Sequence, residues 1–346
     1  MRVARFHAPG DIRLEDSPEP RPGPADVKIR VRNCSTCGTD VKIFKHGHYR
    51  IDPPRVMGHE IAGEITETGQ EVTGWQAGDR VQVIAAIPCG RCAACRRGWQ
   101  TVCPHQESMG YQYDGGFAEY LVVPGKVLAV GGLNRIPDTV GFAEASVAEP
   151  LACVLNGQEL ARVGPGDVVV VIGAGPIGCL HVRLARARGA ARVFLADLNP
   201  LRLAMAASRV APDGTICSQE TDPVAAVRAL TGGSGADVVI TAAASRVAQE
   251  QAVRMAAPRA RISLFGGLPK DDPVIGLDSN AVHYSELTIV GANGSSPAQN
   301  TRALELIAAG EVTISDLITH RLPLGEVHKA IDIVSQGDAI KVTVEP

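Results

Sequence analysis

Four cysteines lie within one short stretch of the sequence, PCGRCAACRRGWQTVC, which spans residues 88 to 103. Such a stretch could be a redox centre, a disulfide knot, an iron–sulfur site, a catalytic metal site or a structural zinc site. Cys89, Cys92, Cys95 and Cys103 have the spacing C-x2-C-x2-C-x7-C. Four thiolates in one compact loop can complete a tetrahedron around zinc and leave no open position for a substrate. The spacing therefore favours a structural zinc.

The alternatives to a structural zinc each lack a feature that they would need. The ferredoxin pattern has three residues before its last cysteine, and this stretch has seven. A redox Cys-x-x-Cys is expected next to a thioredoxin-like βαβ unit, whereas this loop lies in a strand-rich region. The chain has nine cysteines, and an odd number is not typical of a disulfide framework.

A second candidate metal site is dispersed along the sequence. Its members are Cys37 in CSTCGTD, His59 and Glu60 in VMGHE, and Glu149 in AEPLAC. A catalytic zinc takes about three ligands of these types and keeps one position open. Ligands that are far apart in sequence suit this role, because they can come from separate loops that converge on one site.

A glycine-rich motif predicts a dinucleotide site. Gly173, Gly175 and Gly178 form G-x-G-x-x-G in GAGPIG, in which Pro176 and Ile177 separate the last two glycines. The motif lies between a β-branched run, VVVVI, and a helical pattern, so pyrophosphate can bind at the helix N-terminus. Asp197, at the end of the next predicted strand, would accept hydrogen bonds from the adenosine ribose and disfavour a 2′-phosphate. We therefore expect NAD rather than NADP.

These sites require two kinds of folded unit to position them. Residues 1 to 150 contain short apolar or alternating runs broken by Gly, Pro and Asp, which predict a small β-barrel with few helices. From residue 151, strands alternate with helices of ten to fifteen residues, which predicts a doubly wound parallel sheet. The chain is thus expected to be an α/β protein of two domains.

The composition is that of an ordinary globular protein. Hydrophobic residues make up 45% of the 346 residues, and the formal net charge is −3. No long run of one charge points to nucleic acid or to an anionic membrane surface. We find no signal-like apolar segment at the start and no apolar run long enough to span a bilayer. We therefore expect a cytoplasmic protein with no nucleic-acid or membrane partner.

Together these motifs resemble the zinc-dependent medium-chain alcohol dehydrogenases, in particular the branch of sorbitol (L-iditol) and L-threonine dehydrogenases. The similarity runs nearly end to end and also includes GGFAEYLVVP at 115–124 and ADLNPLRL at 196–203. It implies a GroES-like β-barrel catalytic domain, residues 1–150 completed by 291–346, and a Rossmann NAD-binding domain, residues 151–290. It also implies that zinc and nicotinamide meet in the cleft between these domains.

The resemblance assigns roles to single residues of the catalytic site. Cys37 and His59 match the two constant zinc ligands, and Glu60 matches the acid that ligates zinc or sits close to it. Glu149 matches the acid that holds zinc directly or through water, and it points to the polyol and threonine branch. Thr39 matches the hydroxyl residue that binds the substrate oxygen and begins the proton relay. Lys42 stands where relatives often have a histidine, so the outer part of that relay differs here.

The resemblance also extends the cofactor site and implies a reaction. Asp197 and Arg202 match the pair that holds the adenosine ribose, and we expect further cofactor contacts from Leu268 and Asn293. The expected reaction is NAD-linked oxidation of a secondary alcohol of a polyol-like substrate, with one catalytic and one structural zinc per chain. Alternatives are an L-threonine 3-dehydrogenase, a general secondary-alcohol dehydrogenase and a non-enzymatic NAD-binding redox sensor. A homo-oligomer, a dimer or a tetramer, is the expected assembly.

Overall fold

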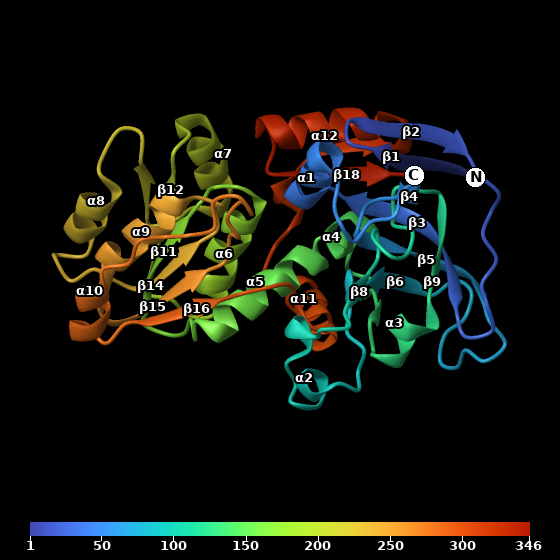
Figure 1. Cartoon of the computed structure of the whole chain (residues 1–346), viewed down its shortest axis with the longest axis horizontal. Coiled ribbons are helices and arrows are strands. Elements are labelled where there is room, and N and C mark those ends of the chain that lie inside the picture. The colour runs from blue at the N-terminus through green and yellow to red at the C-terminus, as the bar shows by residue number, and fades with distance from the viewer. The chain divides into compact units, whose positions relative to one another are not determined.

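The computed structural model describes all residues from Met1 to Pro346, which form two compact units. The first unit contains Met1–Ala152 and Gly294–Pro346, and the second contains Cys153–Asn293. The sequence-based boundaries followed residues 150 and 290. The α/β fold class predicted from the sequence is confirmed: one unit is rich in short strands, and the other is built on a parallel sheet (Figure 1).

A seven-stranded sheet is the framework of the first unit. Its order is β10–β6–β5–β3–β18–β17, with β9 also paired to β3. The strands are β3 (Val27–Ser35), β5 (Glu60–Thr68), β6 (Arg80–Val83), β9 (Tyr120–Val123), β10 (Leu133–Arg135), β17 (Ile318–Pro323) and β18 (Lys341–Glu345). Smaller sheets join β1 (Arg2–Ala8) with β2 (Asp11–Asp16) and β4 (Arg55–Val56), and β7 (Ala86–Ile87) with β8 (Glu107–Ser108).

Inward-facing residues of these strands form the core of the first unit. Val27, Ile29 and Val31 alternate along β3, and all three are at most 1% exposed. The period of two places them on one face of the sheet. The helices of this unit are α1 (Gly38–His46), α2 (Ala93–Arg96), α3 (Gly125–Ala129), α4 (Phe142–Ser146), α11 (Pro297–Ala308) and α12 (Val327–Gln336), with 3-10 turns at Gln100–Val102, Ser315–Leu317 and Leu324–Glu326.

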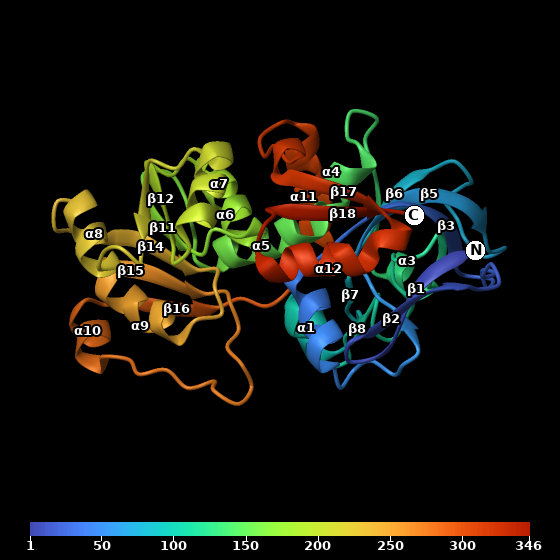
Figure 2. The ribbon, with the colours of Figure 1, turned by 90° about the horizontal axis from the view of Figure 1, so that it is seen from above.

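The last strand of the chain, β18, lies inside this sheet between β3 and the edge strand β17. β18 pairs antiparallel with β3, with Thr343 opposite Ser35 and Val344 opposite Cys34, and parallel with β17. Figures 1 and 2 both show this red strand beside the blue β3. The C-terminal segment is therefore part of the framework that carries the residues just after β3.

The second unit is a six-stranded parallel sheet in the order β13–β12–β11–β14–β15–β16. The central strand β11 (Val168–Ile172) is buried along Val169–Val171, as expected for a strand covered on both faces. Helices lie on both sides of this sheet (Figures 1 and 2). The remaining elements are β12 (Arg192–Asp197), β13 (Gly214–Cys217), β14 (Ala236–Thr241), β15 (Ala256–Leu264), β16 (Thr288–Gly291), α6 (Pro176–Ala187), α7 (Pro200–Val210), α8 (Pro223–Leu230), α9 (Arg246–Met255) and α10 (Ser279–Tyr284).

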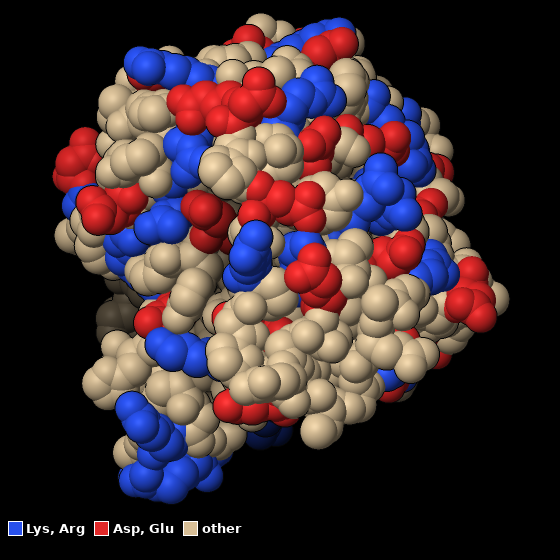
Figure 3. Space-filling model, turned by 90° about the vertical axis from the view of Figure 1, so that its right-hand side faces the viewer, with Lys and Arg blue, Asp and Glu red and all other residues tan.

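Helix α5 (Ala148–Leu160) runs across the boundary between the two units. None of the helices combines the length and apolar character that crossing a lipid bilayer requires. On the face shown in Figure 3, Lys and Arg are interspersed with Asp and Glu, in keeping with the small net charge of −3.

Candidate metal and dinucleotide sites

Cys37, His59 and Glu60 come together from two neighbouring segments of the first unit. Cys37 is the N-cap of α1, which follows β3, and Glu60 begins β5 directly after His59. β3 and β5 are antiparallel neighbours in which Ser35 lies opposite Glu60. One ligand atom from each of Cys37, His59 and Glu60 lies within 4.8 Å of the other two. This donor set and this spacing fit a zinc ion.

The buried carboxylate of Glu60 supports the same fit. Its side chain is 1% exposed, and its Oε1 has neither a hydrogen bond nor an ion pair. A buried oxygen without a partner is costly, and a bound cation would compensate for it. Gly58, just before His59, has a φ of +88°, and a Cβ there would lie 2.7 Å from Cys34 Sγ. Only glycine therefore allows this close approach beneath the metal ligands.

Asp40 orients the histidine of this group. Its Oδ1 lies 3.5 Å from His59 Nδ1, and its Oδ2 accepts a hydrogen bond of 2.8 Å from the backbone N–H of Cys37. Burial alone would lower the pKa of His59, but the charge and hydrogen bonding of Asp40 and of Cys37 together outweigh burial and hold that pKa well above its usual range. A carboxylate on Nδ1 directs Nε2 to a metal. We assigned Asp40 no role from the sequence, although its Cys-x-x-Asp spacing is that of a helix capping box.

Lys341 brings a positive charge to the same place from the far end of the chain. Its Nζ donates a hydrogen bond of 2.8 Å to the carbonyl of Thr36 and forms an ion pair with Glu60 Oε2. Burial is the largest influence on Glu60 and raises the pKa of its carboxyl to about 7, against the opposing effect of Lys341. No local motif in the sequence singles out Lys341, so sequence analysis missed it.

Glu149 lies outside the group of three ligand atoms but close enough to act on it electrostatically. It occupies the first turn of α5 and is 7% exposed. Its charge helps to raise the pKa of Glu60 and that of Lys341. Thr39, half-buried, is the second residue of α1, two positions after Cys37. Lys42 is exposed on the same helix.

The four cysteines of the loop 88–103 also converge. One sulfur from each lies within 4.8 Å of the others. Cys89 Sγ is 4.0 Å from Cys95 Sγ, and Cys92 Sγ is 3.8 Å from Cys103 Sγ. These distances exceed the length of a disulfide bond by about 2 Å, and all four thiols are free. Backbone N–H groups of Arg91 and Cys92 lower the pKa of Cys89 to about 6, which favours a thiolate.

The glycine motif forms the turn between β11 and α6 that the sequence predicted. Gly173 has a φ of +114°, and a Cβ on Gly178 would lie 1.7 Å from the carbonyl oxygen of Gly173. Gly175 is the N-cap of α6 and supplies no side-chain cap, and a Cβ on it would meet nothing within 4 Å. The first backbone N–H groups of α6 therefore border open space, which fits the phosphates of a dinucleotide.

The other predicted cofactor residues lie at the same edge of the parallel sheet. Asp197 ends β12, and its carboxylate accepts backbone hydrogen bonds from Ala174 (2.7 Å) and Asn199 (2.8 Å). Arg202 is in the first turn of α7, which Asn199 caps. Leu268 follows β15, and Asn293 follows β16. The carboxyl ends of parallel strands are where such sheets bind ligands.

Two protein families match the sequence. Residues 23–132 match the family described as Alcohol dehydrogenase GroES-like domain, and residues 176–309 match the family described as Zinc-binding dehydrogenase. The first match lies in the strand-rich unit with the ligand group and the cysteine loop, and the second begins within the glycine motif. Both matches therefore coincide with the sites described above.

Individual relatives cover nearly the whole chain. Sorbitol dehydrogenase of Halalkalibacterium halodurans is 33% identical over 99% of this chain and 98% of its own length. L-threonine 3-dehydrogenase of Bacillus velezensis is 35% identical over 96% of this chain and 95% of its own. The solved structure of a zinc-binding dehydrogenase from Sinorhizobium meliloti bound to NADP is 31% identical, with a TM-score of 0.92 over 100% and 99% of the two chains.

Proposed function

The chain belongs to the zinc-dependent alcohol dehydrogenase family, in its sorbitol and L-threonine dehydrogenase branch, and on that premise we propose that it oxidises a secondary alcohol of a polyol-like substrate to a ketone with NAD. Membership makes it an oxidoreductase that uses zinc and a nicotinamide cofactor. The observation that carries the proposal is the convergence of Cys37, His59 and Glu60 within 4.8 Å.

Cys37 and His59 would hold the catalytic zinc, with Glu60 or Glu149 as the acidic ligand. A zinc ion bound there would supply a Lewis acid that makes the hydroxyl of a bound alcohol more acidic. The carboxylate of Asp40 faces Nδ1 of His59 and would favour the tautomer that offers Nε2 to a metal. Lys341 balances the charge of Glu60 in a region from which water is excluded.

The hydroxyl of Thr39 would take the proton from the substrate alcohol. The residue is half-buried at the start of α1, two positions after the ligand Cys37, and a hydroxyl in that position suits a proton acceptor. Lys42, one helical turn further on, is exposed and would pass the proton only through solvent. A nicotinamide cofactor held at the glycine motif and Asp197 would supply the hydride acceptor for the oxidation.

The cofactor site supports NAD as the preferred dinucleotide. Asp197 is 8% exposed, and two backbone hydrogen bonds fix its carboxylate at the end of β12. A carboxylate held there suits the two ribose hydroxyls and repels a 2′-phosphate. Arg202 stands in the adjacent helix turn, where a guanidinium can pack on the adenosine. The Sinorhizobium meliloti structure contains NADP, so both cofactors have to be compared directly.

The cysteine loop would hold a second, structural zinc. Its four sulfurs can occupy all four positions of a tetrahedral ion, which leaves none for a substrate. This arrangement supports a division of labour in which the loop stabilises the first unit and the dispersed group performs the chemistry.

One assay tests the function as a whole. NADH and NADPH formation is measured across polyols, cyclitols, simple secondary alcohols and L-threonine, and the zinc content of the same sample is determined. We expect about two zinc ions per chain, the highest kcat/KM with a polyol-like alcohol, and NAD as the better cofactor. Light scattering on the sample tests for the expected homo-oligomer.

Variants then separate the proposal from its alternatives. Cys37→Ser and His59→Asn should each abolish turnover and remove one zinc, with little change in NAD binding. Wild-type activity in either variant would refute the zinc assignment. NAD binding with no turnover on any alcohol would favour the redox-sensor hypothesis, and a clear preference for L-threonine would make the protein a threonine dehydrogenase.

A further inference from the structure

Tyr111 links the candidate metal group to a second set of polar side chains. Its ring centroid lies 6.4 Å from that of His59 and 5.1 Å from that of His48. The guanidinium carbon of Arg50 lies 5.8 Å from the same ring centroid. Tyr111 is therefore the common neighbour of a metal ligand and of a cationic side chain. Arg50 lies one tyrosine ring away from the site at which the alcohol would react.

Arg50 differs from every other sheltered cation of the first unit. Each other Lys or Arg in that unit that is buried or half-buried has a carboxylate within 4 Å, namely Arg5, Lys28, Arg32, Arg55, Arg80 and Lys341. Arg50 is half-buried and has no carboxylate at that distance. Its one side-chain hydrogen bond runs from Nη2 to the carbonyl of Gln106, at 2.5 Å.

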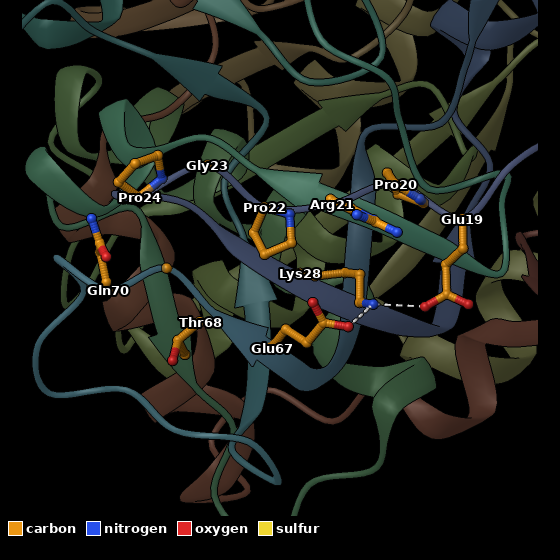
Figure 4. A pocket seen from close by; sticks show the side chains of 11 residues that line it. Glu19, Pro20, Arg21, Pro22, Gly23, Pro24, Lys28, Glu67, Thr68 and Gln70 are labelled. Carbon is orange, nitrogen blue, oxygen red and sulfur yellow. Dashed lines mark hydrogen bonds and ion pairs between the residues drawn. The ribbon is translucent and has the colours of Figure 1, made fainter.

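Lys28 is an example of a buried cation of the first unit whose charge is compensated by carboxylates. It lines a surface hollow of about 810 Å³ beside the loop Glu19–Pro24 (Figure 4). Lys28 is only 4% exposed, and its amine forms ion pairs with both Glu19 and Glu67. Two carboxylates therefore already neutralise the charge in that hollow. The contrast makes the uncompensated guanidinium of Arg50 the exception.

Two loops fix the position of Arg50. Its backbone N–H donates to His48 Nδ1 at 3.2 Å, and its carbonyl accepts from Gln112 Nε2, also at 3.2 Å. Gln112 is itself held, because its Oε1 accepts from the backbone N–H of Ser108 at 2.9 Å. The backbone of Arg50 is thus held from the segment after α1 and from the segment after β8, and the guanidinium is held by its bond to Gln106. A side chain that is already ordered loses less entropy when it binds a ligand.

We propose that the alcohol substrate carries an anionic group, a phosphate or a carboxylate, and that Arg50 binds this group while the reacting carbinol lies at Cys37 and His59. This inference rests on the proposed alcohol dehydrogenase function. Arg50 is a specificity-determining residue of that site.

The chemistry of the guanidinium favours such a group over a neutral hydroxyl. A guanidinium has five N–H donors in a planar fork, and only one of those of Arg50 is used within the protein. The fork matches two oxygens of a phosphate or a carboxylate, and such charge-assisted bonds are about twice as strong as neutral ones. A neutral polyol would leave the half-buried charge uncompensated, so an anionic substrate gains more from this site.

The test compares alcohols that differ only by an anionic group. Sorbitol is paired with sorbitol 6-phosphate, and butan-2-ol with 3-hydroxybutyrate, so that phosphate and carboxylate are distinguished. We expect the wild-type enzyme to have at least a tenfold higher kcat/KM for the anionic member of one pair. Arg50→Gln should lower kcat/KM for the anionic member about 30-fold, mainly by raising KM. For the neutral member, kcat/KM should fall by no more than about threefold. Arg50→Lys should recover part of the loss.

Binding provides a second readout that does not depend on turnover. Each alcohol is titrated calorimetrically into the enzyme saturated with NADH, in which no oxidation can occur. The anionic member should bind more tightly than the neutral one, and Arg50→Gln should remove the difference. Arg21→Gln, which removes an exposed arginine outside both metal groups, is the matched control and should behave as wild type.

Two results would overturn the inference. One is a preference for the neutral member of both pairs in turnover and in binding. The other is an equal effect of Arg50→Gln on neutral and anionic members. If no alcohol of any class is oxidised, the proposed function fails, and the NADH-complex titration alone decides whether the site prefers an anion.

Discussion

Lys341, the first residue of the last strand, forms an ion pair with Glu60, the first residue of β5, and the two side chains are only 3% and 1% exposed. The pair joins the C-terminal segment to the candidate metal group, because the same ammonium also donates to the carbonyl of Thr36, one residue before Cys37. Removing one charge of a buried pair leaves the other charge uncompensated, and this uncompensated charge accounts for most of the loss in stability.

Lys341→Met should therefore destabilise the protein strongly. We expect the free energy of unfolding of the zinc-free protein, in which no metal ion compensates Glu60, to fall by about 3–5 kcal/mol, measured by urea denaturation. The double variant Lys341→Met/Glu60→Gln should recover at least about 1 kcal/mol of that loss, since no buried charge is then left unpaired. Strictly additive effects of the two substitutions would show that the ion pair does not couple these residues.

Asp40→Asn should weaken the hold on the catalytic zinc without removing a ligand. The carboxylate faces His59 Nδ1 at 3.5 Å, and its loss frees the imidazole to rotate or to change tautomer. Losses of such supporting carboxylates cost about 10- to 100-fold in metal affinity. Zinc release to a chromogenic chelator measures the effect, and Asp16→Asn, an exposed residue of β2, is the control. Equal zinc retention in both variants would remove Asp40 from the site.

Cys95→Ser should affect stability before it affects chemistry. Cys95 is 9% exposed, and its sulfur is one of four that can surround a closed metal site. We expect the loss of one zinc per chain and a Tm lower by about 5 °C or more, while kcat per folded chain at low temperature changes little. Cys217→Ser, outside both metal groups, should keep the zinc content and the Tm. Normal stability with lost turnover would reverse the roles of the two sites.

Asp197→Ser should reduce the preference for NAD over NADP. The carboxylate that the variant lacks is the group that disfavours a 2′-phosphate, and one charged hydrogen bond corresponds to about tenfold or more in affinity. The ratio of kcat/KM for the two cofactors should therefore fall by at least about tenfold. Asp138→Ser, a fully exposed control in the first unit, should leave the ratio as it is. An unchanged ratio in Asp197→Ser would show that Asp197 does not determine the preference for NAD.

The features that sequence analysis found are those whose signal is local or compositional. Gly173, Gly175 and Gly178 are close in sequence, Gly173 has a positive φ and Gly178 has no room for a Cβ, so the turn and its helix follow from the motif. The parallel sheet follows from the alternation of strand and helix patterns. The confirmed fold class rests on this alternation and on the glycine motif. The four cysteines were equally visible, because one short loop contains them all.

The features that sequence analysis missed depend on strand order. Lys341 meets Glu60 only because β18 inserts beside β3, and nothing in KVTVEP indicates which strand it will pair with. Arg50 could be recognised as part of the site only from its contact with Tyr111, which lies about sixty residues later in the chain. Asp40 could have been identified from the sequence, because the Cys-x-x-Asp capping box is a short-range pattern.

His181 should make the protein less stable in mild acid. It is fully buried in α6, where Phe265 packs edge-on against its ring and Gln158 Nε2 donates to its backbone carbonyl. Burial lowers the pKa of His181 to about 3. In the unfolded chain the same imidazole titrates near 6.5, so between these values the unfolded state binds one more proton. Stability therefore rises with pH in this window and is lost on acidification.

His181→Gln removes that proton uptake and so should flatten the pH dependence. Between pH 6 and pH 4, the free energy of unfolding of the wild type should fall more steeply than that of the variant, by up to about 1.4 kcal/mol per pH unit. Urea denaturation at several pH values measures the two slopes. His283→Gln, an exposed histidine of α10, should keep the wild-type slope. Parallel slopes for wild type and His181→Gln would mean that His181 is protonated in the folded protein.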